Sequence, residues 1–296
     1  MNKAIPYKFD NQFKAAARKH QSNFRERVLF VDIDLSTKEK YGTFLSENAA
    51  KEGLNFYEGY RDEIKGVAGK YNQGSWANML RSEHIPLNIF VPMKLDKQKT
   101  KRLLNDMLKL DIAAIDDIKI EYAPDPKENY LQDRTAFDTY IEYTHRDGSK
   151  GGIGIEVKYT EVAYKLISGS TEEQVVTRED NIYQTCGSKS GYFIDATDKR
   201  LIEDDFRQIW RNHLLGVSMM QKFDIKYFNS VHLYPAGNDH FVKIIPKYEE
   251  LLTENGKQTF TALTFENLFE YMKNYFTDDK QRDWVNYLQR RYIIEK

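Results

Sequence analysis

The chain has 296 residues and a formal net charge of −1, with 44 Lys and Arg against 45 Asp and Glu. This length can bury a sizeable core in one large domain or two small ones. Because clustered cations provide phosphate affinity, a near-neutral chain that binds nucleic acid must do so through local basic groups.

The cysteine count and the hydropathy pattern exclude several other classes. A lone Cys186 excludes an internal disulfide and a cysteine-based zinc site, and it fits a reducing cytoplasm. The first twenty residues are polar, and no apolar run approaches 18 residues. We therefore expect no signal peptide and no membrane span, and we expect a cytoplasmic protein.

The first third of the chain predicts helices. Residues 10–27 read as a basic, moderately amphipathic helix, and residues 46–62 and 75–84 also read as helical. Apolar residues recur clearly at helical spacing in residues 97–110. Ser46 is a candidate N-cap, Gly53 interrupts the second helix, and Pro86 limits the third. We expect an N-terminal helical region over residues 1–96, packed on a core over residues 97–296.

The spacing of the apolar residues changes from a helical to an alternating pattern after residue 110. Residues 117–122 alternate as a strand, residues 135–161 predict a β-hairpin, and residues 162–204 form a long polar insert, expected to be a lid or a recognition segment. A strong helix over 205–222, a buried strand over 231–236 and a mostly helical end over 247–296 follow. The predicted order from residue 97 is therefore helix, three strands, insert, helix, strand.

The hairpin carries Asp138 on one arm and Glu156 with Lys158 on the other. A tip at Asp147 places Asp138 opposite Glu156, and a tip at Gly148 places it opposite Lys158. Both registers put the three side chains on one face. The other face would carry an apolar surface of Phe137, Ile141, Tyr143, Ile153, Ile155 and Val157.

Two carboxylates that face each other on a hairpin need a compensating charge. A divalent cation would provide it, and Mg²⁺, for which Mn²⁺ can substitute, suits oxygen ligands beside phosphate. Lys158 would hold or deprotonate a water or steady developing charge on phosphorus. Gly152 and Gly154 on the same face would leave room for a substrate backbone.

The short pattern of an acid two residues before a lysine is weak evidence by itself. It recurs at Glu63/Lys65, Asp117/Lys119, Asp125/Lys127, Asp224/Lys226 and Asp278/Lys280. Only Glu156/Lys158 lies in an apolar strand with an acid at the matching height of the preceding strand. The alternative is a solvated hairpin face with an ordinary Glu–Lys pair.

Seven segments carry a resemblance to a known family: GLNFY (53–57), LRSEHIPLNIFVP (80–92), IEYAP (120–124), RTAFD (134–138), GIEVKYTE (154–161), RQIWRNHLL (207–215) and LYPAGN (233–238). With them the chain resembles the PD-(D/E)xK nuclease superfamily and, more narrowly, a bacterial group of restriction endonucleases within it. The resemblance implies an α/β fold with a restriction-endonuclease-like core: a mixed central sheet flanked by helices, in the order αβββαβ.

The resemblance also implies roles for single residues. Asp138 and Glu156 would bind the metal with the carbonyl of Val157, and Lys158 would be the catalytic lysine. Glu121 would complete the metal site or orient a water, unless it only forms a strand-end salt bridge. Where relatives often have Ser-Gln this chain has Ser82-Glu83, so Glu83 is a further candidate ligand. Glu47 is a weaker one and fits a solvated helix residue better.

The helix over 205–222 would bring polar residues to the site. Gln208 and Arg211 lie three residues apart on one face, and we favour a site role for Gln208 more than for Arg211. His213, His232 and His240 are expected to be structural, and Tyr183 and Gln184 in the insert have little support as substrate contacts. No phosphate-binding glycine loop and no nucleophile-elbow motif is present.

The expected partner is nucleic acid, most of all DNA, and no membrane. Local basic groups occur at Lys14/Arg18/Lys19, Arg25/Arg27, Lys97/Lys99/Lys101/Arg102 and Arg290/Arg291, with Tyr7, Phe9, Phe24 and Tyr292 nearby as stacking candidates. Because the chain is near neutral, we expect modest affinity, a homodimer that joins two basic faces, or a partner protein that delivers the substrate.

The sequence therefore predicts a Mg²⁺-dependent endonuclease that acts on DNA, with a possible place in restriction or defence against phage. A nuclease for RNA or for branched DNA remains open, because fold does not fix substrate. A non-catalytic nucleic-acid-binding or assembly protein on the same fold is the rival from another class. The intact set of Asp138, Glu156 and Lys158 argues against that rival.

Overall fold

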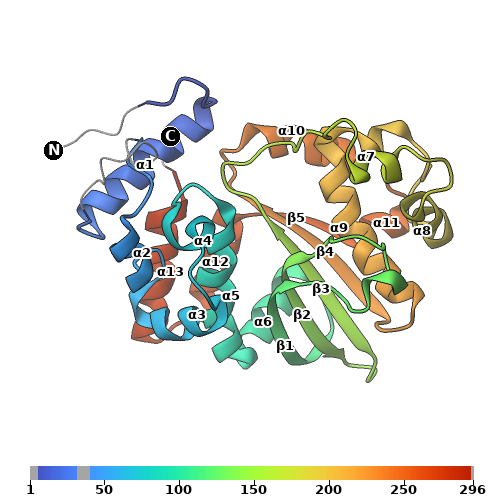
Figure 1. Ribbon diagram of the computed structural model, residues 1–296. Helices are drawn as coiled ribbons and strands as arrows, with labels where there is room; N and C mark the ends of the chain where they lie inside the picture. The colour runs from blue at the N-terminus through green and yellow to red at the C-terminus, as the bar shows by residue number, and fades with distance from the viewer. Residues whose placement is uncertain (1–5, 32–40, 295–296) are drawn as a thin grey trace.

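The computed structural model describes residues 6–31 and 41–294, and its centre is a five-stranded mixed sheet (Figure 1). The strands lie side by side in chain order: β1 (Ile112–Tyr122), β2 (Phe137–His145), β3 (Lys150–Val157), β4 (Tyr227–Tyr234) and β5 (Phe260–Thr264). The first three strands pair antiparallel, whereas β3, β4 and β5 pair parallel. A parallel pair needs a crossover, and the segment between β3 and β4 provides it.

Helices cover both faces of this sheet. The N-terminal part holds α1 (Gln12–Arg27), α2 (Glu47–Glu52), α3 (Arg61–Ala68), α4 (Gln73–Ala77), α5 (Ile85–Leu95) and α6 (Lys97–Leu108). The later part holds α7 (Thr171–Val176), α8 (Ile182–Ser190), α9 (Asp204–Gln221), α10 (Asp239–Glu249), α11 (Glu254–Lys257), α12 (Phe265–Tyr275) and α13 (Asp279–Tyr292). The elements α6, β1, β2, β3, α9 and β4 follow one another in this order. The αβββαβ core expected from the sequence is therefore confirmed.

Two hydrophobic clusters lie on opposite faces of the sheet. The first joins Ile141, Ile153 and Val157 to the N-terminal helices and to α12 and α13. The second packs α8, α9 and α10 against the other face. Figure 1 shows α1 and α13 side by side, so the two ends of the chain build one helical layer. Within the described residues, no helix has the length and apolar character needed to cross a membrane.

Most local predictions match the structure. Ser46 caps α2, its hydroxyl accepting from the Ala49 amide, and Gly53 ends that helix at φ 83°. Residues 75–84, in contrast, do not form one helix. Helix α4 ends at Ala77, and Asn78 pairs as an isolated bridge with Phe44.

Helix α5 and strand β5 are among the elements that were not predicted. Pro86 was interpreted as limiting a helix, but it lies in the first turn of α5, where a missing amide costs nothing. Helix α5 is buried on nearly all sides, so it has no amphipathic pattern to detect. Strand β5 has only five residues in a segment that otherwise reads as helical.

The hairpin has the register that centres it on Asp147. Thr139 pairs with Ile155 and Thr144 with Lys150, so Asp138 lies across from Glu156. One expectation about its faces was wrong: Phe137 belongs to the second cluster, not to the surface of Ile141. Its ring lies over Gly154, where a missing side chain leaves the space.

The glycines of β3 were also misinterpreted. A Cβ on Gly154 would lie 2.3 Å from the ring of Phe137, and one on Gly152 would lie 2.2 Å from the Tyr140 hydroxyl. Both glycines are buried. They therefore accommodate aromatic rings of the protein itself, and they do not leave room for a substrate backbone.

Candidate active site

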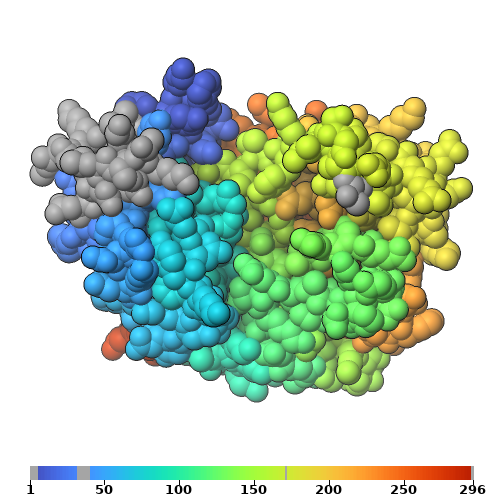
Figure 2. Space-filling view, in the orientation of Figure 1, coloured from blue at the N-terminus to red at the C-terminus, as the bar shows by residue number. Residues whose placement is uncertain are grey.

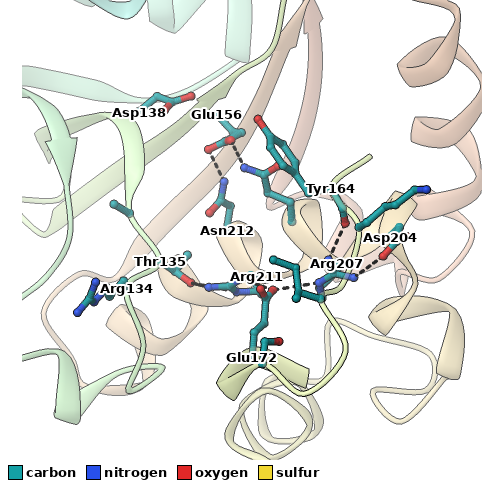
Figure 3. A pocket seen from close by; sticks show the side chains of 15 residues that line it. Arg134, Thr135, Asp138, Glu156, Tyr164, Glu172, Asp204, Arg207, Arg211 and Asn212 are labelled. Atoms are coloured by element: carbon teal, nitrogen blue, oxygen red, sulfur yellow. Dashed lines mark hydrogen bonds and ion pairs between the residues drawn. The ribbon is translucent and has the colours of Figure 1, made fainter. Parts of the chain in front are cut away.

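The site begins at the two carboxylates of the hairpin. Asp138 lies at the start of β2 and Glu156 near the end of β3, on the side of the sheet that α9 covers. The Val157 amide donates to Asp138 Oδ2 at 2.7 Å, which fixes that carboxylate at the opening of the hairpin. Figure 3 shows Asp138 and Glu156 together at one end of the cavity.

Glu156 is almost fully buried and receives three donors. Lys158 Nζ and Gln208 Nε2 each lie 2.5 Å from Glu156 Oε1, and Asn212 Nδ2 donates to Oε2. Gln208 and Asn212 are four residues apart on α9, so both side chains project toward β3. Only 5 % of Glu156 is exposed, so these donors replace water as the hydrogen-bond partners of its carboxylate and fix its orientation.

The charges of the site are unequal. Burial and the neighbouring Glu156 raise the pKa of Asp138 well above its usual value, while Lys158 acts in the opposite sense. The two carboxylates raise the pKa of Lys158 against the effect of its burial, so the ammonium form is favoured. When both carboxylates are ionised, one lysine faces two acids and the site carries an excess of negative charge.

This excess is what a divalent cation would neutralise, and the donor set fits one. Mg²⁺ and Mn²⁺ prefer oxygen ligands, and Asp138 and Glu156 supply them from facing strand positions. No group of three or more His, Cys, Asp and Glu forms a metal cluster among residues 6–31 and 41–294. The protein thus offers two carboxylates, and other ligands would come from main-chain carbonyls such as that of Val157 and from water.

An open cavity of about 470 Å³ adjoins the carboxylates. It is lined by Arg134, Thr135, Ala136, Asp138, Glu156, Tyr164, Lys165, Ile167, Ser170, Glu172, Asp204, Arg207, Gln208, Arg211 and Asn212. Figure 2 shows the surface hollowed between the green segment before β2 and the yellow-green insert. The carboxylates can therefore be reached by a substrate.

Tyr164 is a residue of this site that the sequence did not indicate. Its ring lies 5.0 Å from Lys158 Nζ, a cation–π distance, and the residue is 46 % exposed. Its carbonyl accepts from Arg207 Nη2 at 2.6 Å. Because the residue lies in the irregular start of the insert, no periodicity pointed to it.

Two of the three arginines that line the cavity, Arg207 and Arg211, are neutralised by acids. Arg207 contacts Asp204 and Glu172, and Arg211 contacts Glu172 and Asp133 at 2.6 and 2.7 Å. Glu172 lies in α7, so these bonds fasten the insert to α9 (Figure 3). Arg211 therefore holds the insert and does not touch the carboxylate pair.

Tyr183 joins this network, since its hydroxyl donates to Asp133 Oδ2 at 2.6 Å. The main-chain amide of Gln184 donates to Asn181 Oδ1. Neither contact brings a side chain to Asp138 or Glu156. The insert itself carries α7 and α8, which pack in the second cluster.

Three predicted acids lie apart from the pair. Glu121 is exposed at the end of β1 with φ 51°, and no hydrogen bond or ion pair of the described chain joins it to the site. Glu83 pairs with Arg81, and Glu47 pairs with Lys51 at 2.6 Å on α2. The structure thus brings Asp138, Glu156, Val157, Lys158 and Gln208 together, but not Glu121, Glu83 or Glu47.

Glu161 is a further acid whose charge reaches the pair. Its charge helps to raise the pKa of Asp138, and its oxygens accept from the amides of Ser82 and Tyr159 at 2.8 and 2.9 Å. Its sequence signal was its place at the end of the segment 154–161 that carries the family resemblance. That segment gave no role to Glu161 itself.

The three histidines that were expected to be structural lie in packed or ion-paired positions. His213 is buried and contacts the hydroxyls of Tyr248 and Thr259 at 3.0 and 2.8 Å. His232 is buried against the ring of Phe241. His240 Nε2 lies 3.8 Å from Asp205 Oδ1.

Several of the basic and aromatic candidates for substrate contact are buried or already paired within the protein. Arg25, Arg291, Phe24 and Tyr292 are buried, and Arg291 bonds the Asn55 carbonyl at 2.7 Å. Lys99 Nζ forms an ion pair at 3.3 Å with Asp278, which is the N-cap residue of α13. Lys14, Lys19, Arg27, Arg102 and Arg290, with Tyr7 and Phe9, retain partial or full exposure.

Comparison with known proteins gives one match. Neither the curated proteins nor the solved structures contain a match to this chain. A family model, described as the PD-(D/E)XK nuclease superfamily, matches residues 8–294. That range includes both carboxylates, Lys158 and α9, and nearly all of the chain. The protein belongs to the PD-(D/E)XK nuclease superfamily.

Proposed function

We propose that this protein is a metal-dependent endonuclease that hydrolyses phosphodiester bonds in DNA. The observation that carries the proposal is that Asp138 and Glu156 both line one open cavity, with Lys158 bonded to Glu156 beside it. The superfamily supports a nuclease in general. Dependence on Mg²⁺ and the choice of DNA are our inferences from the donor set and the resemblance.

Asp138 and Glu156 would hold the metal, with the Val157 carbonyl as a third ligand. A bound divalent ion would polarise the scissile phosphate and lower the pKa of an attacking water. Gln208 and Asn212 would keep Glu156 turned toward the ion, since each donates to one of its oxygens. They are positioning residues in this account.

Lys158 would act as a cation. Its ammonium donates to Glu156 in the present arrangement, so it is placed as a hydrogen-bond donor and not as a proton acceptor. At this place it would orient the attacking water and steady the charge that develops on the phosphoryl oxygens. We give no role in this step to Glu121 or Glu83, which lie apart from the pair.

Two exposed cations border the cavity and would contact flanking phosphates. Arg134 precedes β2, and Lys165 follows Tyr164 in the insert. Both are free of ion pairs within the described residues, unlike Arg207 and Arg211. A role in restriction or in defence against phage would follow from the narrower resemblance.

The test is cleavage of supercoiled plasmid, linear duplex, single-stranded DNA and RNA with Mg²⁺ or Mn²⁺. We compare wild type with Asp138→Asn and Lys158→Ala. Matched controls are Glu142→Gln, from the far end of β2, and Lys119→Ala, its ion-pair partner. We expect wild type and the controls to cleave DNA, and the two site variants and EDTA to abolish cleavage.

Other outcomes would redirect the assignment. Cleavage of RNA alone, or of branched DNA alone, would keep the site and change the substrate. If wild type cleaves nothing and binds no metal, the nuclease proposal falls and a scaffold role is favoured. Cleavage by Asp138→Asn at the wild-type rate would also contradict it.

A further inference from the structure

A second cavity opens on the segment that leaves β3, toward the N-terminal helices. It has a volume of about 210 Å³. Its lining includes Tyr7, Lys14, Arg18, Tyr41, Arg81 and Glu161, which we call the N-terminal subsite.

The N-terminal subsite adjoins the candidate active site through Glu161. Glu161 lines the subsite, and Tyr164, three residues further along the same segment, lines the first cavity. Thr160, which also lines the subsite, donates its hydroxyl to the Leu80 carbonyl at 2.9 Å. A single strand that occupied both cavities would therefore follow the segment from Thr160 to Tyr164, whose two ends line the two cavities.

One wall of the subsite is a fixed group of planar side chains. The rings of Tyr7 and Tyr41 meet edge to face at 4.9 Å, and the Arg18 guanidinium lies 5.6 and 5.2 Å from their centroids. Asp10 at 2.5 Å and Thr43 at 3.2 Å hold Arg18 in place. Aromatic and guanidinium planes are the surfaces on which unpaired bases stack.

The charge of the subsite suits a phosphate beside such a base. Lys14 has no ion pair with any described residue. Arg81, whose side chain is 52 % exposed, is paired with Glu83, and an ion pair this exposed adds little strength in water. Glu161 is the opposing acid. Both of its oxygens already accept main-chain amides, which offset part of its charge.

We propose that the N-terminal subsite binds one unpaired nucleotide of the substrate, with its base against Tyr7 and Tyr41 and its phosphate at Lys14 and Arg81. The cavity lies below the range of about 300–1,000 Å³ that drug-sized ligands need, so it suits one base and excludes a duplex. The proposal rests on the proposed nuclease function. It deepens that function, because the preferred substrate would carry a single-stranded tract next to the scissile bond.

The test is the binding of fluorescein-labelled oligothymidine, its oligouridine counterpart and a duplex of equal length to the full chain, measured by anisotropy in EDTA. The variants are Tyr7→Leu with Lys14→Gln, and Tyr7→Phe alone. The matched control is Tyr71→Leu with Lys70→Gln, because Tyr71 has the same 37 % exposure as Tyr7 and lies outside the subsite. Lys14→Glu alone reverses one charge at the surface. It tests the subsite if the double variant fails to fold.

We expect the double variant to weaken single-strand binding by about 5- to 150-fold, the effect of losing one stacked base. Lys14→Glu should weaken it too, whereas Tyr7→Phe and the control should bind as wild type does, and duplex binding should change far less. The two oligonucleotides distinguish a DNA strand from an RNA strand.

Three results would overturn the proposal: no binding of either single strand by wild type, no difference between the variants and the control, or an equal loss for duplex. Cleavage assayed in parallel separates the two claims. If the variants lose binding while wild type cleaves nothing, the subsite stands and the nuclease function falls. If wild type cleaves and the variants bind normally, only the subsite falls.

Discussion

At the scale of single residues, the site depends on how a buried carboxylate is satisfied. Glu156 is held by donors from two separate elements, the end of β3 and the face of α9. Removing a carboxylate from water is costly unless such donors replace the lost hydration. Helix α9 therefore matters to the site as much as the hairpin does.

The sequence predicted only some of the residues that surround Glu156 and Lys158. Gln208 was predicted because it shares a face with Arg211 on a strong helix, but Asn212 and Tyr164 were not. An amide one turn further along a helix is common on solvated surfaces, so Asn212 carried no distinct signal. Tyr164 reaches Lys158 only through the path of the insert, which Arg207 fixes and which no local pattern encodes.

The ring of Tyr164 gives a prediction for the rate. Cation–π contacts are worth about 0.5–2 kcal/mol, so Tyr164→Leu should lower kcat by about 2- to 30-fold. Tyr164→Phe keeps the ring and should retain wild-type kcat. Steady-state cleavage kinetics measure both variants. A Tyr164→Leu enzyme with unchanged kcat, or an equal loss in Tyr164→Phe, would show that the ring does not position Lys158.

At the scale of elements, the hairpin was predictable because alternation and turn chemistry agree. The Asp147-Gly148 tip sets the register, and Gly148 adopts φ 83° as such a turn requires. Alternation could not show that Phe137 leaves its face to fill the space above Gly154. That packing depends on the absence of a side chain on the neighbouring strand.

Glycine-to-alanine variants test this packing. Gly154→Ala would place a Cβ 2.3 Å from the Phe137 ring, so we expect a loss of about 1–3 kcal/mol in the free energy of unfolding. Gly66→Ala is the control, because that exposed position in α3 has nothing within 4 Å of the new Cβ. It should be neutral or stabilising by up to about 1 kcal/mol. Urea titration measures both, and equal effects would contradict the packing account.

At the scale of the whole molecule, two cores on opposite faces of one sheet place the site at their boundary. The order of the core elements followed from the sequence, because each has a clear period or a turn signal. Helix α5 and strand β5 did not follow, since one is buried all round and the other is short. Contacts across long sequence separations, such as Trp284 donating to the Asn88 carbonyl at 2.8 Å, have no local signature.

Buried histidines give a prediction for pH. Burial lowers the pKa of His213 and His232 to about 3 and that of His84 well below its usual value. Below about pH 6.5 the unfolded chain takes up protons that the folded chain does not, so stability falls as pH falls from about 6.5 toward 3. Each histidine contributes up to about 1.4 kcal/mol per pH unit.

Urea unfolding between pH 7.5 and 5 measures this slope. We expect His213→Gln, which keeps a donor and an acceptor near Tyr248 and Thr259, to reduce the slope by one histidine's share. Wild-type stability that stays constant over this range would contradict the account. So would an unchanged slope in the variant.

The central claim is that Asp138 and Glu156 together hold a divalent cation. The most direct test is calorimetric titration of the protein with Mn²⁺ and Mg²⁺, comparing wild type, Asp138→Asn, Glu156→Gln and the control Glu142→Gln. The account predicts one site in wild type and in Glu142→Gln, with affinity lost or strongly reduced in the two site variants. Equal binding by Asp138→Asn and wild type, or no binding by wild type, would contradict it.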